Sequence, residues 1–222
     1  MLLIFDLDNT LYPTHEQVIQ CREAAVKAMM KRGLPGTYEE IRKELNKVIK
    51  EKGSNYNQHF DLTVKRMTNL SRREQLAIIT AGVTKYNTTK QELMKPYSET
   101  TRVLKKLKKK HNTCILTKGK EKKQWDKINR LGLYPYFKNN VWIVSDEESK
   151  ETAIKKILKK FKTTNALLIG DRPDSDIKAA NKTGIKSAQL MKGPYKNIKG
   201  PEPDYKINNL KELLKLLKSA DD

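Results

Sequence analysis

The chain has 222 residues, of which 46 are Lys or Arg and 26 are Asp or Glu, so its formal net charge at pH 7 is +20. Hydrophobic residues make up 37% of the chain, a content that excludes an intrinsically disordered protein, and a chain of this length can bury a large core. The two cysteines, Cys21 and Cys114, lie far apart in apolar stretches, which indicates neither a disulfide framework nor a Cys-based zinc site. We therefore expect a reduced, cytoplasmic protein.

No apolar run approaches the roughly 18 residues that span a bilayer. The opening MLLIFDLDNT turns acidic after five apolar residues and carries no basic flank, so it does not read as a secretory signal. We expect no membrane partner. The lysine excess favours anionic partners such as phosphorylated metabolites or nucleic acid, or else it reflects the general lysine enrichment found in some high-temperature organisms.

In chain order, the first predicted element is a buried strand at 2–6, and the region 14–92 that follows shows only helical patterns. Further short apolar runs predict strands at 113–117, 141–145, 166–170 and 186–190, with an edge strand in DYKI at 204–207. Amphipathic patterns predict helices at 98–110, 120–132, 150–161 and 173–184, and a last helix in NNLKELLKLLK at 208–218. Strands that alternate with helices indicate an α/β fold with a parallel sheet.

The helical stretch interrupts this alternation after the first strand. We therefore predict two parts: a Rossmann-like core made of residues 1–13 and 93–222, with helices flanking the parallel sheet, and a helical cap made of residues 14–92.

Acidic residues follow two of the predicted strands. Asp6 and Asp8 end the first strand in FDLDNT, and side chains two apart in an extended segment face the same way. Asp171 ends the strand ALLIG, and Asp174 and Asp176 lie in the next turn. Carboxylates that meet at the carboxyl ends of parallel strands repel one another unless a cation binds, and hard oxygen ligands point to Mg²⁺.

Groups suited to an anion follow the other strands. Thr117 ends the strand CILT, with Lys118 after it, and offers a hydroxyl near a helix N-terminus. Lys150 opens the helix after VWIVSDEES. Acids for a metal together with donors for an oxyanion indicate phosphoryl chemistry.

Four features occur in a fixed order along the chain: FDLDNT, ILTKG, a lysine at a helix start and IGDRPDSD. Together they resemble the four motifs of the haloacid dehalogenase superfamily, and the resemblance covers essentially the whole chain. The resemblance implies Asp6 as nucleophile, Asp8 as general acid/base, and Thr117 and Lys150 as ligands of the phosphoryl group. It also implies Mg²⁺ bound by Asp6, Asp171 and the backbone carbonyl of Asp8. Asp176, and less directly Asp174, would support the metal or its waters.

Two positions depart from the family pattern. Lys118 stands where Asn or Asp is common, which adds positive charge at the rim and extends the predicted phosphate-binding set. Lys150 lacks the Lys-Pro pairing frequent in the family, and Lys155 and Lys156 are its rivals. We also expect acidic neighbours and partial burial to raise the pKa of Asp8, as a general acid requires.

The predicted function is a Mg²⁺-dependent phosphatase that hydrolyses a small phosphorylated metabolite through an aspartyl-phosphate. The segments KGSNYNQHF, ITAGVTKYN and KQWDKINRLGL are similar to archaeal cap-bearing phosphatases, including those acting on glyceraldehyde 3-phosphate, and FDLDNTLYP is similar to the opening of pyrimidine 5′-nucleotidases. Sugar phosphates, triose phosphates and nucleotide monophosphates are therefore the candidate substrates.

Two alternatives stay open. The same motifs serve a phosphomutase or phosphotransferase, in which only the acceptor differs. A basic nucleic-acid-binding protein would use the +20 charge and runs such as KKLKKK at 105–110. We expect no specific nucleic acid, because the lysines fall on several helices and no nucleic-acid-binding motif occurs. The sequence makes no prediction of oligomeric state.

Overall fold

A computed structural model describes residues 1–145 and 147–218 of the chain. Two compact units are present: a core unit, Met1–His15 with Met94–Asp222, and a helical unit, Glu16–Leu93. Each unit has its own buried core and is described by itself.

A six-stranded sheet forms the centre of the core unit, and all of its neighbouring strands are parallel. The strands are β1 Leu2–Phe5, β2 Asn112–Lys118, β3 Val141–Val144, β4 Ala166–Gly170, β5 Lys186–Leu190 and β6 Tyr205–Ile207. Their order, β3-β2-β1-β4-β5-β6, is that of a doubly wound α/β sheet. The predicted Rossmann-like fold is confirmed, and DYKI supplies the edge strand as expected.

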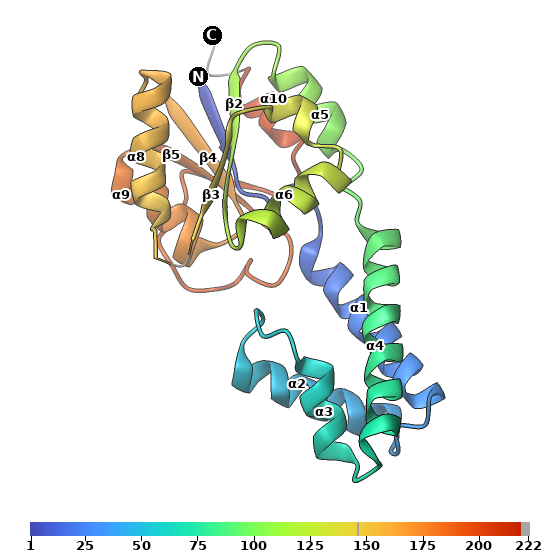
Figure 1. The fold of residues 1–222 in the computed structure, drawn as a ribbon. Helices are drawn as coiled ribbons and strands as arrows, with labels where there is room; N and C mark the ends of the chain where they lie inside the picture. Colours follow the sequence, from blue (N-terminus) through green and yellow to red (C-terminus); the bar gives the residue numbers. More distant parts are fainter. Residues whose placement is uncertain (146, 219–222) are drawn as a thin grey trace. The chain divides into compact units, whose positions relative to one another are not determined.

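Helices cover both faces of this sheet (Figure 1). The core-unit helices are α5 Thr100–Leu107, α6 Glu121–Arg130, α7 Tyr134–Phe137, α8 Lys150–Phe161, α9 Lys178–Thr183 and α10 Glu212–Leu216, with one turn of π-helix, η1 Pro173–Ile177. Figure 1 shows α8 and α9 on one face and α5, α6 and α10 on the other. The helix predicted at 173–184 therefore begins as a π-turn. It ends where expected, at Gly184 in the left-handed conformation with φ of 71°.

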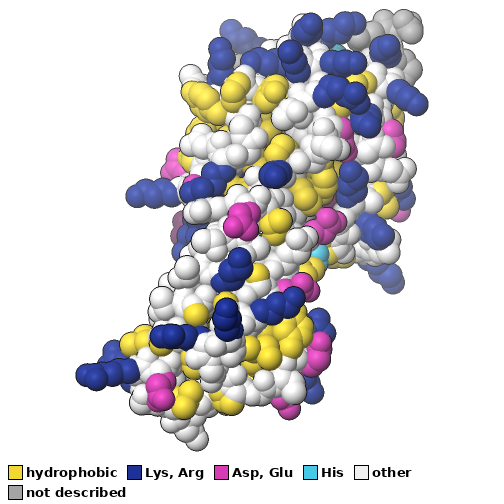
Figure 2. Space-filling model, turned by 90° about the vertical axis from the view of Figure 1, so that its right-hand side faces the viewer, with side chains coloured by type: hydrophobic (Ala, Val, Ile, Leu, Met, Phe, Trp, Pro, Cys, Tyr) yellow, Lys and Arg dark blue, Asp and Glu magenta, His cyan; other side chains and the backbone are white. Residues whose placement is uncertain are grey.

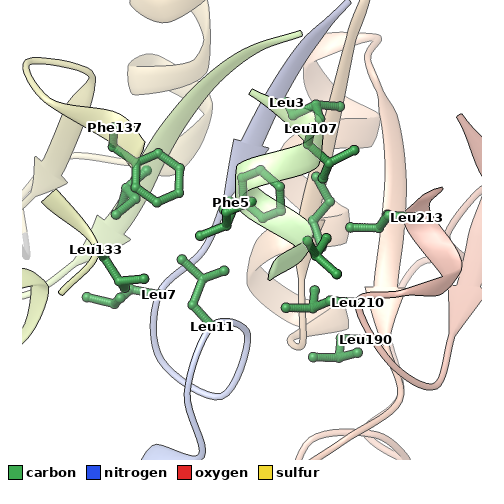
Figure 3. Packing of buried hydrophobic residues seen from close by; sticks show 14 of the residues in the cluster. Leu3, Phe5, Leu7, Leu11, Leu107, Leu133, Phe137, Leu190, Leu210 and Leu213 are labelled. Carbon is green, nitrogen blue, oxygen red and sulfur yellow. The ribbon is translucent and has the colours of Figure 1, made fainter. Parts of the chain in front are cut away.

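The side chains of the strands alternate between two buried clusters, one on each face of the sheet. On β1, Leu3 and Phe5 pack with α5, α7 and α10, whereas Leu2 and Ile4 pack toward α8 and α9. Figure 3 shows part of the first cluster, in which the rings of Phe5 and Phe137 meet edge to face with centroids 6.0 Å apart. Burial on both faces explains why the strands read as continuous apolar runs.

The helical unit contains most of α1 Thr14–Lys31 and all of α2 Tyr38–Lys52, α3 His59–Met67 and α4 Arg72–Leu93. Its core includes Val26, Met29, Leu45, Val64 and Ile78. A capping box between Thr37 and Glu40 starts α2. Among the described residues, none of the helices combines the length and apolar character that a membrane span requires.

The strand order fixes where the predicted site forms. β1 is central, with β2 on one side and β4 on the other, and the chain crosses from one half of the sheet to the other between β3 and β4. Ligands of open α/β sheets bind at the carboxyl ends of strands beside such a switch point. Asp6, Thr117 and Asp171 lie at those ends.

Candidate active site

Three buried carboxylates meet at the carboxyl ends of β1 and β4. Asp6 directly follows β1 and Asp171 directly follows β4, its hydrogen-bonded neighbour in the sheet. Asp6, Asp171 and Asp176 each place a carboxylate oxygen within 4.8 Å of the other two. We call these three residues the acidic cluster.

Local backbone geometry brings Asp176 into this cluster. The π-turn η1 carries Asp176 back toward β4, and the backbone N–H of Arg172 donates to Asp176 Oδ2 at 3.1 Å. A Cβ atom on Gly170 would lie 2.4 Å from Asp176 Cγ, closer than any packed pair of carbon atoms. The glycine that ends β4 therefore leaves the space that the Asp176 side chain fills.

Lys150 is the cation of the acidic cluster. It is the first residue of α8, whose N-cap Ser149 accepts from the backbone N–H of Thr152. Its Nζ donates to Asp6 Oδ1 and to Asp176 Oδ1, at 2.6 Å in both cases. The rivals Lys155 and Lys156 are exposed, and Lys156 pairs with Glu148. Of the three lysines, Lys150 alone reaches the acidic cluster.

The acidic cluster carries more carboxylates than one ammonium group neutralises. Burial raises the pKa of Asp6, the ion pair with Lys150 opposes this, and repulsion by Asp176 and Asp8 adds to it, so that the pKa of Asp6 is about 7. Burial and the charges of Asp6 and Asp176 likewise raise the pKa of Asp171 to about 8. Burial disfavours the Lys150 ammonium, but the charges of Asp176 and Asp6 outweigh it and raise the pKa of Lys150.

The acidic cluster fits a divalent cation. Oδ2 of Asp171 is buried and accepts no hydrogen bond from any described residue. A buried carboxylate oxygen without a partner is costly, and a cation would complete its coordination. The donors are hard carboxylate oxygens, which Mg²⁺ prefers. Asp6, Asp171 and Asp176 are the side chains that could hold it.

The side chain of Asp8 turns away from the acidic cluster into a hydrogen-bond network of its own. Its Oδ1 accepts from Tyr12 Oη at 2.6 Å and from Thr14 Oγ1 at 2.8 Å. Lys127 Nζ lies 2.7 Å from Oδ1 and 2.8 Å from Oδ2, and Gln124 Nε2 donates to Oδ2 at 3.2 Å. We call these five residues the Asp8 network.

The expectation of a raised pKa for Asp8 is wrong in this structure. Burial does act to raise the pKa, but the charge of Lys127 and the hydrogen bonds from Lys127, Tyr12 and Thr14 outweigh it. The pKa of Asp8 is therefore lower than usual, and the carboxylate stays ionised at neutral pH. Acidic residues are the near neighbours of Asp8 in the sequence, whereas the lysine that pairs with it lies 119 residues further along the chain.

Gln124 joins the Asp8 network to the predicted phosphate-binding strand end. Its Nε2 also donates to Thr117 Oγ1 at 2.6 Å and to the backbone carbonyl of Lys118 at 3.1 Å. Thr117 is buried, whereas the Lys118 side chain is exposed. Asp174 does not belong to the acidic cluster. It is half exposed and forms an ion pair with Arg172 through two hydrogen bonds.

Sequence reasoning missed Gln124 and Lys127, although α6 offered a signal. Gln124, Ile128 and Leu131 are all buried and follow the spacing of one helix face. A glutamine within an apolar stripe needs polar partners, which indicates a buried polar group next to the helix. Lys127 lies one turn further along α6 than Gln124 and reaches the same carboxylate.

Residues 3–190 match the family model described as haloacid dehalogenase-like hydrolase. A glyceraldehyde 3-phosphate phosphatase from Methanocaldococcus jannaschii is 38% identical over 226 residues, covering 98% of this chain and 96% of that protein. One of the same name from Methanopyrus kandleri is 32% identical, covering 97% of this chain and 96% of that protein. The crystal structure of the HAD-hydrolase YfnB from Bacillus subtilis, bound to magnesium, has a TM-score of 0.64 at 19% identity and covers 97% of both chains.

The structural similarity to YfnB supports the fold. The family match spans most of the chain, and the two archaeal relatives align over nearly their whole length. The chain belongs to the haloacid dehalogenase-like hydrolases.

Proposed function

We propose that this enzyme is a Mg²⁺-dependent phosphatase that hydrolyses a small phosphorylated metabolite through an aspartyl-phosphate on Asp6. A triose phosphate, glyceraldehyde 3-phosphate, is the first candidate substrate, because the relatives from Methanocaldococcus jannaschii and Methanopyrus kandleri carry that name. The acidic cluster is the observation that carries the proposal: three buried carboxylates around one buried ammonium group.

Asp6 would act as the nucleophile. It lies at the end of the central strand, where a bound phosphoryl group would meet its carboxylate. Attack by a carboxylate on a phosphate requires neutralisation of negative charge on both partners. Lys150, 2.6 Å from Asp6 Oδ1, supplies one positive charge and is buried, so water screens it little.

Asp6 and Asp171, with Asp176 beside them, would hold Mg²⁺, which would supply the second positive charge. The backbone carbonyl of Asp8 is a further ligand that family resemblance suggests. The Thr117 hydroxyl, held by Gln124 at 2.6 Å, would donate to a phosphoryl oxygen.

Asp8 would act as the general acid/base. Hydrolysis of the aspartyl-phosphate requires a base that takes a proton from water, and an ionised Asp8 serves this step directly. Protonation of the leaving alkoxide requires the other form of Asp8. The ion pair with Lys127 opposes that form, so this pair must weaken when substrate is bound.

The test is a panel of phosphoesters assayed with excess Mg²⁺ and with EDTA. The panel contains glyceraldehyde 3-phosphate, glucose 6-phosphate, a nucleoside monophosphate and p-nitrophenyl phosphate. We expect release of free phosphate that depends on Mg²⁺, fastest with the triose phosphate. Transfer of the phosphate to an added sugar acceptor in place of release would identify a phosphotransferase. No turnover of any phosphoester with Mg²⁺ would refute the proposal.

A further inference from the structure

Two lysine-rich segments that are far apart in sequence line one groove of the core unit. The first is the KKLKKK run after the start of α5, and the second is the KELLKLLK segment that contains α10. The groove has a volume of about 450 Å³ and is lined by Lys106, Leu107, Lys109, Lys110, His111, Lys211, Leu214, Lys215, Leu217 and Lys218. We call it the lysine groove.

The lysine groove has an apolar floor and cationic edges. Leu107 and Leu217 are buried and Leu214 is partly buried, and all three belong to the core cluster on that face of the sheet. Lys215 lies in α10, whereas Lys211 directly precedes this helix and Lys218 follows its C-cap residue. Their aliphatic stems extend the apolar walls while their ammonium groups stay in water.

Most of these lysines have no acidic partner. Within residues 1–145 and 147–218, no ion pair is formed by Lys106, Lys109, Lys110, Lys211 or Lys218. Figure 2 shows Lys and Arg side chains gathered over the upper end of the core unit, with hydrophobic side chains among them. Unpaired like charges repel one another, and an anionic partner would relieve this repulsion.

The lysine groove is separate from the active site. His111 directly precedes β2, and Thr117 and Lys118 are at the other end of that strand. A strand of this length spans roughly 20 Å, so the lysine groove and the acidic cluster lie at opposite ends of the strands. Nothing in the proposed reaction uses the lysine groove.

We propose that the lysine groove binds an acidic amphipathic helix of a partner protein. The apolar face of such a helix would cover the leucine floor, and its carboxylates would lie along the two rows of lysines. The apolar floor distinguishes this partner from a nucleic acid, whose phosphates would contact the lysines and leave the leucines uncovered. Among the described residues that line the groove there is no Phe, Tyr or Trp for base stacking, and His111 is its only ring.

A flat anionic membrane fits the groove less well than a helix does. The large hydrophobic side chains that are exposed among the described residues are Ile19, Leu76, Val83, Tyr134 and Ile198, and none of them lines the groove. The leucines are recessed between the lysines, where a bilayer surface would not reach them but single side chains of a helix would.

The test measures binding of fluorescent peptides to the full chain by anisotropy at about 0.15 M salt. The probe is an amphipathic peptide of about 14 residues, with Leu on one face and Glu elsewhere. One control peptide replaces Leu with Ser, another replaces Glu with Lys, and a single-stranded RNA of similar length serves as a polyanion without apolar side chains. We expect the Leu/Glu peptide to bind at least about 10-fold more tightly than every control.

Matched variants locate the binding. Lys109→Glu with Lys215→Glu reverses two charges of the lysine groove, and Leu214→Asn alters its floor. Lys155→Glu with Lys159→Glu makes the same change of net charge on the exposed face of α8. We expect both groove variants to weaken peptide binding by about 10-fold or more, the α8 variant to change it by less than about 3-fold, and phosphatase activity to stay unchanged in all three.

Equal loss of binding in the α8 variant would refute the proposal, because general charge attraction would then explain it. RNA that binds more tightly than the peptide, with no effect of Leu214→Asn, would assign the groove to nucleic acid instead. The two lysine pairs are exposed, so these variants keep the fold, and phosphate release shows independently whether the proposed function holds.

Discussion

Asp6 and Asp8 are separated by one residue at the end of β1, yet their carboxylates have opposite surroundings. The acidic cluster sets three buried carboxylates against one ammonium group, and the pKa of Asp6 rises to about 7. The Asp8 network sets one carboxylate against one ammonium group and adds three neutral donors, and the pKa of Asp8 falls.

This difference agrees with the two separate chemical roles proposed for Asp6 and Asp8. The acidic cluster has three carboxylates and one ammonium group, so a cation would stabilise it, as the proposed metal and nucleophile site requires. The Asp8 network is already neutral and fixes the direction of its carboxylate, as expected of a proton-transfer group. Substitutions on the two sides should therefore differ in kind, and the following predictions run from the largest expected effect to the smallest.

Asp6→Asn should abolish phosphate release. The amide keeps the shape of the side chain but cannot attack phosphorus, so we expect kcat to fall by at least on the order of 10⁴-fold. Asp174→Asn is the matched control, because Asp174 is an acid in the same loop that, among the described residues, forms its ion pair with Arg172 and lies outside the acidic cluster. Its kcat should change by no more than about 2-fold. Activity near that of the wild type in Asp6→Asn would remove Asp6 from the role of nucleophile.

Lys150→Met should affect both stability and turnover. Without its ammonium group, Asp6 and Asp176 lose their buried counter-ion. Breaking a buried pair in this way typically lowers the free energy of unfolding by about 3 to 5 kcal/mol. We expect kcat to fall by on the order of 10² to 10³-fold. Urea unfolding at neutral pH in EDTA and initial rates of phosphate release measure the two effects.

Lys155→Met on the same helix is the control for Lys150→Met. Its side chain is exposed, so the free energy of unfolding should change by less than about 1 kcal/mol. Excess Mg²⁺ should restore part of the stability lost in Lys150→Met, since a second cation can neutralise the same carboxylates. Equal stability of the two variants in EDTA would contradict the charge balance described for the acidic cluster.

Lys127→Met should affect turnover more than stability. Tyr12, Thr14 and Gln124 still donate to Asp8 in this variant, so we expect the carboxylate to remain near its position and kcat to fall by about 10 to 100-fold. Loss of the ammonium group raises the pKa of Asp8, so the acidic limb of the pH–rate profile should move to higher pH. Lys123→Met, exposed on the same helix, should leave the profile in place.

The contrast between Asp6 and Asp8 also shows which parts of the site could be predicted from the sequence. The strands that end at Asp6 and Asp171 were predictable because both are short apolar runs buried on two faces, and parallel strands align their carboxyl ends. Lys150 was predictable because it opens a helix after a strand. These residues depend on secondary structure and strand order, which apolar patterning reports directly.

The surroundings of Asp8 depend on contacts that such patterning does not report. Lys127 is one of many lysines on amphipathic helices, and only the packing of α6 against the core shows that its Nζ reaches Asp8. The approach of Asp176 depends on the π-turn and on the missing side chain of Gly170, a backbone feature that a helical pattern at 173–184 conceals. The lysine groove likewise requires two segments about 100 residues apart to be placed side by side.

The smallest predicted effect is a pH-dependent stabilisation by Mg²⁺. The ordinary pKa of Asp6 and Asp171 is 3.8, whereas in the folded protein the values are about 7 and about 8. At pH values between the ordinary and the raised pKa, the folded state binds more protons than the unfolded state. The contribution of both groups to the free energy of unfolding therefore falls as the pH rises. Mg²⁺ binds the ionised carboxylates, so its stabilising effect should grow over the same range.

Thermal unfolding is measured with excess Mg²⁺ and with EDTA, each at about pH 5 and about pH 8. The two pH values differ in how many of the carboxyl groups with a raised pKa are ionised. We expect a rise of a few degrees in Tm at the higher pH and little or none at the lower one. Asp171→Asn removes a carboxylate whose Oδ2 accepts no hydrogen bond within the described chain, and it should abolish the Mg²⁺ response. The Asp8 network takes no part in this response, so we expect Lys127→Met to keep the stabilisation by Mg²⁺. A Mg²⁺ response lost equally in Asp171→Asn and Lys127→Met would mean that the two carboxylate environments at the end of β1 act as one.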